Sequence, residues 1–367
     1  MSAEGHILVL GAYGLAGRAI IERLLEKTGY AVVAAGRRLE RLHEVIDTRD
    51  SGRGGKLVLD AADTSALRDA CAGAAFVINA IGPYSRNGAA IARTVIECGK
   101  PYLDCANEQL HYRKLSALDS LARDRGVPMI TAAGAIPGLS TLLIADLLKR
   151  FPAAAAVDCC WAQFRHAYAD SGLASMMGGI LEAVDRPVAL RQGQYAPVVI
   201  GRSAMTFDLP PPFGRRHLLE VPTIDALTVP ARFRLQEFHS WFYMGELPTW
   251  LLGLVRILQP DRRPWAYRLI ETTMRRVNNR DTAKAIAAGV GPECLLHVEA
   301  RDENETRSAR RVFWDGALAT ACLPVHIADR HLRGEIAKTG LLTPLDIMKT
   351  EELAGLTEGV AVRSDPT

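Results

Sequence analysis

The chain has 367 residues, of which 49% are hydrophobic and 23% are charged. This composition is typical of a folded globular protein and excludes disordered and collagen-like chains, and at roughly 150 residues per domain the length indicates two domains. The formal net charge is +3, with 44 basic and 41 acidic residues mixed along the chain, so we expect no nucleic-acid partner.

Seven cysteines are spread through apolar segments without a Cys-x-x-Cys pair. We therefore predict no metal site and no disulfide framework, and we expect a reduced, cytoplasmic protein. The start, Met1–Gly5, leads directly into an apolar strand and is not typical of a signal peptide. The longest apolar stretches, Leu139–Leu148 and Trp250–Leu258, are shorter than the roughly 18 residues of a membrane-spanning helix.

The first 135 residues alternate short apolar runs with segments whose apolar residues recur every three to four positions. The runs predict strands at His6–Leu10, Ala31–Ala35, Lys56–Leu59, Phe76–Ala80, Tyr102–Leu103 and Pro128–Thr131. The periodic segments predict helices at Leu15–Lys27, Leu39–Ile46, Ser65–Ala72, Ala89–Cys98 and Lys114–Arg125. This order predicts an α/β fold with an N-terminal Rossmann domain, a doubly wound parallel sheet with helices on both faces.

A helix at Leu139–Arg150 leads into an aromatic-rich middle part. Glu293–Arg301 and Arg307–Asp315 alternate around a polar turn and predict an antiparallel hairpin, and Ala317–Ile347 is helical again. We therefore expect an inserted α+β second domain and C-terminal helices that pack back on the first domain. The expected boundaries are 1–135 plus roughly 317–350 for the Rossmann domain, 136–316 for the second domain, and 355–367 for a flexible tail.

A glycine turn follows the first predicted strand and opens the first helix. Gly11 permits a tight turn, Gly14 lets the backbone approach a pyrophosphate, and Gly17 lets the helix pack closely on the strand. In this strand–turn–helix context the spacing predicts a dinucleotide site. The predicted residues are Gly11, Ala12, Tyr13, Gly14, Leu15, Ala16 and Gly17.

The end of the second predicted strand distinguishes the two dinucleotides. An NAD site places a carboxylate there for the ribose 2′-hydroxyl, whereas this chain has Gly36, Arg37 and Arg38. Two guanidinium groups suit a 2′-phosphate, so we predict NADP(H) as the cofactor. The alternative is that both arginines only solvate the start of a helix.

Further cofactor contacts are predicted from position at the ends of later strands. Asp60 and Ala61 follow the third strand, on the adenine side, although Asp60 or Asp63 could instead cap the next helix. The segment that ends the fourth strand is expected beside the nicotinamide ribose, unless Gly82-Pro83 forms an ordinary turn. Its residues are Asn79, Ala80, Ile81, Gly82 and Pro83.

Several segments resemble the saccharopine dehydrogenase-like NADP-binding family. They are Val77-Ile-Asn-Ala-Ile-Gly-Pro-Tyr84 with Gly88, Cys98-Gly-Lys-Pro-Tyr-Leu-Asp104, Gly134-Ala-Ile-Pro-Gly138 and Gly334–Pro344. The resemblance implies a Rossmann NADP-binding domain, a second α/β domain, dimerisation and pyridine-nucleotide oxidoreduction. Members of this family reduce imines or, in the branch of trans-acting enoyl reductases, carbon–carbon double bonds, so the resemblance does not name a substrate.

Two other dehydrogenase classes fit poorly. None of the nine tyrosines has a lysine four residues later, which disfavours the short-chain reductases. Cys98 and Cys105 lie among packing residues, which disfavours a thiolate nucleophile. The remaining chemistry is direct hydride transfer, and an iminium acceptor needs no strong protein acid.

Candidate substrate-contacting residues or proton donors are Tyr84 and His166, unless they are packing residues. Ala106 and Asn107 follow the fifth strand at the carboxyl edge of the sheet, where Asn107 is predicted near the nicotinamide amide. Glu108 could simply cap the next helix.

The middle part of the chain leaves two alternatives open. Its aromatic residues could line a pocket for a bulky substrate or form a core or dimer interface. They are Trp161, Phe164, Tyr168, Trp241, Phe242 and Tyr243. The stretch Pro248–Pro260, with Arg262, Arg263 and Arg268 after it, could lie on a membrane surface, but a buried helix is expected.

The residues together with the family resemblance thus predict an NADP(H)-dependent reductase that transfers hydride to a C=N bond of a small-molecule substrate. The resemblance also implies that residues 136–316 bind substrate and mediate dimerisation, so we expect a homodimer. The alternatives are an enoyl reductase acting on a lipid or polyketide precursor, a non-catalytic NADP(H)-binding sensor or scaffold, and a lipid-associated protein.

Overall fold

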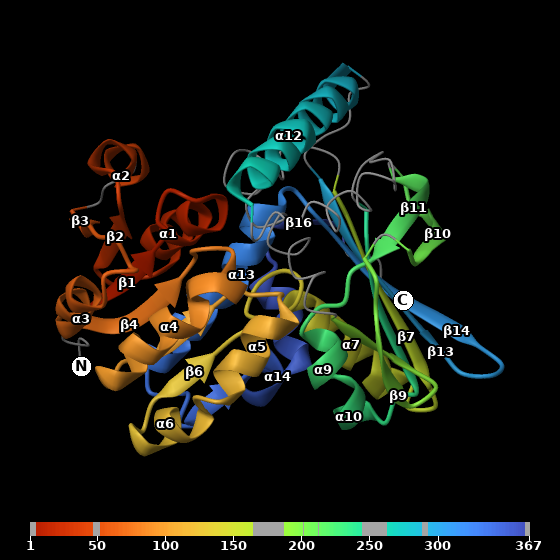
Figure 1. The fold of residues 1–367 in the computed structure, drawn as a ribbon. Coiled ribbons are helices and arrows are strands. Elements are labelled where there is room, and N and C mark those ends of the chain that lie inside the picture. The colour runs from red at the N-terminus through yellow and green to blue at the C-terminus, as the bar shows by residue number, and fades with distance from the viewer. Residues whose placement is uncertain are drawn as a thin grey trace. The chain divides into compact units, whose positions relative to one another are not determined.

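The computed structural model describes residues 5–46, 52–163, 187–200, 202–211, 213–243, 263–287 and 293–363. The chain divides into two compact units (Figure 1). Unit 1 comprises Met1–Ala106, His111–Leu139 and Ala317–Glu352. Unit 2 comprises Asn107–Leu110, Ser140–Gly316 and Leu353–Thr367.

Unit 1 is built on a sheet in which every described strand pair is parallel. Its strand order is β15-β6-β5-β4-β1-β2-β3. The strands are β1 (His6–Leu10), β2 (Val32–Gly36), β3 (Gly54–Val58), β4 (Ala74–Asn79), β5 (Tyr102–Asp104), β6 (Pro128–Ile130) and β15 (Gly340–Leu342). The chain order reverses between β1 and β4, and ligands of such sheets bind beyond the carboxyl ends of the strands at this switch point. The α/β prediction is confirmed.

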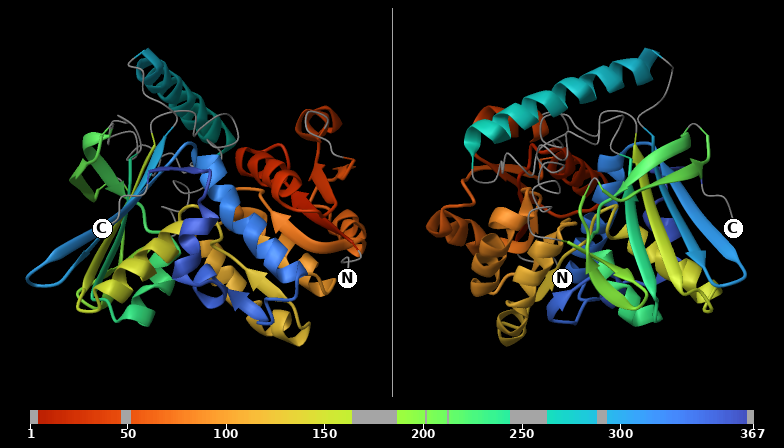
Figure 2. Two further views of the ribbon diagram at one scale, coloured as in Figure 1. Left: turned by 180° about the vertical axis from the view of Figure 1, so that it is seen from behind. Right: turned by 45° about the vertical axis from the view of Figure 1, so that its right-hand side comes forward.

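Helices cover both faces of this sheet. On one face α1 (Leu15–Lys27) and α2 (Leu39–Ile46) contact each other and the first strands. On the other, α4 (Tyr84–Glu97) contacts both α3 (Thr64–Ala72) and α6 (Asp119–Asp124). Figure 1 shows α4 in front of the sheet, and the view from behind in Figure 2 brings the blue α13 to the front. The central strands β1 and β4 are buried on both faces, which explains their continuous hydrophobic runs in the sequence.

The segment expected to be one helix before the sixth strand is divided. It forms two helices, α5 (Gln109–Ser116) and α6. At the junction between them, the Leu118 amide donates to the Leu115 carbonyl at 2.8 Å.

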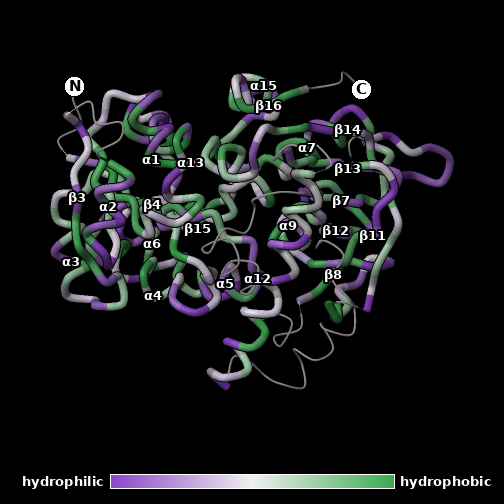
Figure 3. Tube along the Cα trace, turned by 90° about the horizontal axis from the view of Figure 1, so that it is seen from above, coloured by the Kyte–Doolittle hydropathy of each residue, from purple (hydrophilic) through white to green (hydrophobic). Residues whose placement is uncertain are grey.

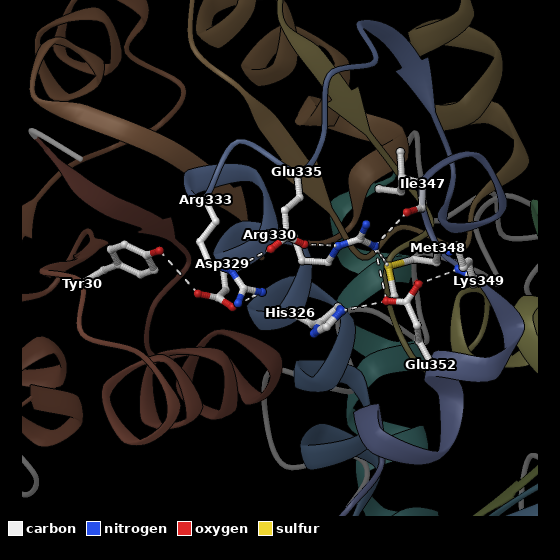
Figure 4. A network of polar contacts seen from close by, with 10 residues as sticks. All are labelled: Tyr30, His326, Asp329, Arg330, Arg333, Glu335, Ile347, Met348, Lys349 and Glu352. Carbon is white, nitrogen blue, oxygen red and sulfur yellow. Dashed lines mark hydrogen bonds and ion pairs between the residues drawn. The ribbon is translucent and has the colours of Figure 1, made fainter. Parts of the chain in front are cut away.

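The C-terminal part returns to unit 1 through α13 (Gly316–Leu332), α14 (Pro344–Ile347) and the short helix η2 (Thr350–Glu352). Arg330 of α13 joins these elements, because its guanidinium donates to the Ile347 carbonyl at 2.9 Å and contacts Glu352 at 3.3 Å (Figure 4). Between α13 and α14 the chain adds β15, a seventh strand that the helical pattern did not predict. Its three residues are too few for a period, and only pairing with β6 defines them.

Unit 2 contains a mixed sheet of order β10-β11-β12-β7-β13-β14-β16, and β8 also pairs with β12 and β9. Its strands are β7 (Ala156–Gln163), β8 (Val188–Arg191), β9 (Gln194–Pro197), β10 (Ala204–Leu209), β11 (Gly214–Glu220), β12 (Glu237–Phe242), β13 (Cys294–Arg301), β14 (Thr306–Phe313) and β16 (Ala361–Arg363). Its helices are α7 (Leu139–Arg150), α9 (Asp225–Thr228), α10 (Pro230–Phe233), α12 (Pro264–Ala287) and α15 (Leu353–Leu356).

The predicted antiparallel hairpin is present as β13 and β14, joined by a hydrophilic turn that is purple in Figure 3. Strand β16 lies within the segment expected to be a flexible tail, and it pairs with β14. Among the described residues, no helix is both long and apolar enough to cross a membrane.

Candidate functional site

The turn between β1 and α1 brings three glycines into close backbone contacts. Gly11 has a φ of +77°, and a Cβ there would lie 2.9 Å from the Ala80 carbonyl oxygen. A Cβ on Gly17 would lie 2.3 Å from the Gly11 carbonyl oxygen, so α1 approaches this closely only because residue 17 is glycine. Gly14 is the N-cap of α1 and offers no side chain to the helix N-terminus. The structure therefore places residues 11–17 as a phosphate-binding turn requires.

The end of β2 lies next to this turn. The Tyr13 ring covers Gly36, where a Cβ would lie 2.5 Å from Tyr13 Cε1. The Arg37 amide donates to the Tyr13 hydroxyl oxygen at 3.2 Å. The side chains of Arg37 and Arg38 are exposed. A tyrosine hydroxyl and two guanidinium groups are thus available at the carboxyl end of β2.

The acidic residues after β3 support the backbone. Asp63 is the N-cap of α3, and its carboxylate accepts from the Ser65 and Ala66 amides at 3.0 and 3.1 Å. Asp60 is exposed and accepts from the Ala62 amide at 3.1 Å. The capping alternative therefore holds for Asp63, while Asp60 remains exposed beside the buried Ala61.

The end of β4 lies against the glycine turn. The Ala80 amide donates to the Leu10 carbonyl at 2.9 Å, and the Ile81 amide donates to Asn79 Oδ1 at 3.0 Å. Tyr84 is buried, and its hydroxyl donates to the Asn79 carbonyl at 3.2 Å. The structure thus brings residues 79–83 beside residues 11–17, and it engages the hydroxyl proton of Tyr84 inside the protein. The other candidate proton donor, His166, lies outside the described residues.

The residues after β5 divide between the two units. Burial raises the pKa of the Cys105 thiol, and this thiol donates to the Ala133 carbonyl at 3.6 Å. Cys105 therefore stays protonated at neutral pH and is no thiolate nucleophile. Ala106 is buried in unit 1. In unit 2, the Asn107 amide donates to Glu108 at 3.1 Å, and the Asn107 carbonyl accepts from the Ile224 amide at 3.2 Å.

A buried polar network that the sequence patterns do not predict lies at the carboxyl ends of β4, β5 and β6. Its centre is Asp104, which is fully buried together with His111, Tyr102 and Thr131. His111 Nε2 lies 2.7 Å from Asp104 Oδ2, and Thr131 donates to Oδ1 at 2.6 Å. Burial alone would raise the pKa of Asp104, but His111 and the donors around it lower the pKa, so Asp104 is ionised. A usable signal was present, because Asn79, Asp104 and Thr131 each lie at or directly after the end of a strand on the same sheet edge.

Two buried carboxylates of the unit 2 sheet pair with side chains of neighbouring strands. Asp158 is fully buried, accepts from Trp241 Nε1 at 2.6 Å and contacts Arg301. Glu220 is also buried and lies 2.7 Å from His239 Nδ1, while burial, which would raise its pKa, is outweighed by His239 and its other partners.

The aromatic residues that could have lined a pocket lie on opposite faces of the unit 2 sheet. Trp161 pairs in register with Phe242, whereas Trp241 pairs with Cys160 and Tyr243 follows on the Trp241 face. Since neighbouring positions of a strand point to opposite faces, these side chains do not form a single lining. Phe164 and Tyr168 lie outside the described residues.

A doubly wound parallel sheet with a glycine turn at its switch point defines unit 1 as a dinucleotide-binding domain of the Rossmann type. Residues 7–130 match the saccharopine dehydrogenase NADP binding domain family. This part of unit 1 is therefore similar to that family of NADP-binding domains.

Two curated relatives match part of the chain. A "Lipid droplet localized protein" of Caenorhabditis elegans is 30% identical over 138 residues, which is 35% of this chain and 32% of the relative. A Mycobacterium tuberculosis protein, provisionally assigned as a trans-acting enoyl reductase, is 28% identical over 201 residues, which is 52% of this chain and 47% of the relative. The matches thus span a third to a half of the relatives' length.

Two solved structures share the fold over nearly the whole chain. Apo saccharopine dehydrogenase (L-Glu forming) from Saccharomyces cerevisiae aligns with a TM-score of 0.64 and 14% identity, covering 98% of this chain and 99% of that one. Homospermidine synthase from Legionella pneumophila, in complex with NAD, aligns with a TM-score of 0.64 and 10% identity, covering 98% and 90%. At these identities the likeness concerns the fold alone.

The residues present fit a dinucleotide. A Cβ on Gly14 would meet the Gly11 carbonyl oxygen at 3.1 Å and the Ala80 carbonyl oxygen at 4.0 Å, and apart from its chain neighbours no described side chain lies within that distance. Residues 11–17 would hold the pyrophosphate, the end of β2 the adenosine ribose, and residues 79–83 the nicotinamide half.

Proposed function

We propose that this protein is an NADP(H)-dependent oxidoreductase that reduces a C=N bond, formed by an amine or amino acid and a carbonyl compound. The observation that carries the cofactor proposal is the pair Arg37–Arg38 directly after β2, with the Tyr13 hydroxyl bonded to the Arg37 amide. A 2′-phosphate carries two negative charges, and guanidinium groups bind it by charge-assisted hydrogen bonds. A ribose 2′-hydroxyl without phosphate would leave both arginines without that partner.

NADPH supplies a hydride when bound. The protein would hold the adenosine half at the glycine turn and β2, and the nicotinamide half at residues 79–83. Two groups near the nicotinamide end of this edge that could give a proton already donate within the described part of unit 1: the Tyr84 hydroxyl to the Asn79 carbonyl, and the Cys105 thiol to the Ala133 carbonyl. This favours an acceptor that already carries positive charge, because an iminium takes hydride without protonation by the protein.

The second candidate is reduction of a carbon–carbon double bond in a lipid or polyketide precursor. It is favoured by the 28% identity with the mycobacterial relative assigned as a trans-acting enoyl reductase. Hydride addition to an enoyl group leaves an enolate that must be protonated, so this candidate requires a proton donor that the proposed C=N reaction does not.

Oxidation of NADPH, followed by its absorbance at 340 nm, separates these candidates. One substrate panel contains amine and keto-acid pairs or cyclic imines, and the other contains enoyl thioesters. Turnover of the first panel supports C=N reduction, and turnover of the second replaces it with C=C reduction. Tight NADPH binding without turnover of either panel would instead support a non-catalytic nucleotide sensor. Sedimentation velocity tests the accompanying proposal that the protein is a homodimer.

A further inference from the structure

The Asp104 carboxylate is connected to the loop after β4 by an unbroken line of hydrogen bonds. The Tyr102 hydroxyl donates to Asp104 Oδ2 at 2.9 Å and accepts from Asn79 Nδ2 at 3.0 Å. Asn79 Oδ1 in turn accepts from the Ile81 amide at 3.0 Å. Asn79 and Tyr102 are both fully buried, so water cannot replace the two bonds made by the Tyr102 hydroxyl, whereas the bond from the Ile81 amide is partly buried. The orientation of the Ile81 peptide therefore depends on a carboxylate of the next strand.

Asp104 itself is held from several directions. Its Oδ1 accepts from Thr131 at 2.6 Å and from the Ala106 amide at 3.1 Å, and its Oδ2 accepts from Tyr102 and His111. A carboxylate with this many donors has one rotamer and stays charged. It is thus a fixed anchor for the Tyr102 hydroxyl.

The imidazole of His111, which also binds Asp104, has one nitrogen without a hydrogen-bond partner among the described residues. This nitrogen, Nδ1, is buried, and an unsatisfied buried polar atom is destabilising. The ring also restricts its neighbour, because a Cβ on Gly88 would lie 2.5 Å from His111 Cε1. A histidine that served only to fill space would be replaced at lower cost by an apolar side chain. Its Nε2 bond to Asp104 accounts for its presence.

We propose that Asp104, held by His111, is a positioning residue that sets the loop Ala80–Pro83 for the nicotinamide half of the dinucleotide, acting through Tyr102 and Asn79. This inference rests on the proposed function, since it assigns the loop to that half. The glycine turn and the end of β2 lie outside the line of hydrogen bonds. Loss of the line therefore weakens the binding of the nicotinamide half and leaves the binding of the adenosine half unchanged.

The test compares two variants, each of which removes one hydroxyl group that donates a hydrogen bond to the Asp104 carboxylate. Tyr102→Phe breaks the line to Asn79, whereas Thr131→Val removes a bond to the other oxygen and leaves the line intact. Dissociation constants are measured for NADPH and for adenosine 2′,5′-bisphosphate, which contains only the adenosine half. Hydrogen–deuterium exchange of a peptide covering residues 78–84 is measured without nucleotide.

We expect Tyr102→Phe to weaken NADPH binding by about tenfold, the typical loss for one buried hydrogen bond, and to change binding of the bisphosphate less than about twofold. Exchange in 78–84 should become faster in Tyr102→Phe but not in Thr131→Val. A second variant, Asn79→Ala, should weaken NADPH binding similarly. Combining it with Tyr102→Phe should add nothing, because both act in one line.

Equal effects of Tyr102→Phe and Thr131→Val on NADPH binding and on exchange would overturn the proposal, since Asp104 would then only support the fold. Additive effects of Tyr102→Phe and Asn79→Ala would overturn it as well. Failure of the proposed function looks different: the natural protein would bind neither NADPH nor the bisphosphate, although exchange in 78–84 could still differ between the variants.

Discussion

The two sheets of this protein use buried polar residues in opposite ways. In unit 1 the strands are parallel, and the polar network around Asp104 lies where β4, β5 and β6 end. In unit 2 the sheet is mixed, and Asp158 pairs with Trp241 and Arg301 within the strands themselves. A parallel sheet gathers the ends of its strands at one edge, so its polar residues can serve a ligand there. In unit 2 the same kinds of residue hold neighbouring strands together.

The largest expected effect concerns the glycine turn of unit 1. Gly17→Ala puts a Cβ 2.3 Å from the Gly11 carbonyl oxygen, so the turn must move. We expect NADPH affinity to fall by at least about a thousandfold, equivalent to about 4 kcal/mol, as measured by fluorescence titration. Gly29→Ala is the matched control, since nothing lies within 4 Å of a Cβ there. Unchanged NADPH affinity in Gly17→Ala would remove the glycine turn from the cofactor site.

The stability of unit 2 should depend on pH through one buried carboxyl group, that of Asp225. Burial raises the pKa of Asp225 from 3.8 to about 6, although Thr141 and Ser140 donate to it at 2.5 and 2.8 Å. Because the folded-state pKa is raised, the stability associated with Asp225 is complete below pH 3.8 and is lost as the pH rises through about 6. At neutral pH the ionised form costs of the order of 3 kcal/mol.

Asp225→Asn removes this titration and keeps the shape of the side chain. The free energy of unfolding, measured by urea denaturation from pH 4 to pH 7, should fall less in the variant than in the natural protein. A difference between the two proteins that does not change with pH would show that Asp225 is not the titrating group.

The proposed preference for NADP(H) predicts a selective loss at the end of β2. The double variant Arg37→Ala, Arg38→Ala should bind NADPH about thirtyfold more weakly, which corresponds to one or two charge-assisted hydrogen bonds and about 2 kcal/mol. Its affinity for NADH should not change, and NADH is thus the internal control. Equal losses for both nucleotides, or tighter binding of NADH by the natural protein, would contradict the proposal.

The smallest expected effect tests whether the buried pairs of unit 2 act only on stability. Trp241→Phe removes the donor to Asp158 Oδ1 and keeps an aromatic ring. We expect a loss of about 1–2 kcal/mol in the free energy of unfolding, by denaturant titration. The dissociation constant of NADPH should stay the same. A clear change in that constant would mean that the Trp241–Asp158 pair influences the cofactor site. The buried polar residues of unit 2 would then not act on stability alone.

Local patterns allowed much of unit 1 to be predicted. The strand and helix alternation, the glycine turn and Arg37–Arg38 depend on residues close together in the chain, and each lies at its expected element. His111 could not be assigned in this way. Its role arises from an Asp104 that is seven positions away and on another element, and from a glycine of α4. The aromatic residues of unit 2 were likewise grouped by their proximity in sequence, but β-strand alternation sends Trp161 and Trp241 to opposite faces.

The sequence by itself determined the fold class of unit 1, the place of its glycine turn and the positive charge at the end of β2. These depend on periodicity and on the conformational freedom of glycine, which act over a few residues. Only the tertiary structure decided that β15 joins the sheet, that the Tyr84 hydroxyl is engaged, and that Asp104 is linked to Ile81 through Tyr102 and Asn79. Those contacts depend on the register between strands and on burial, because a hydrogen bond between distant residues forms only when the fold brings both groups together and excludes water.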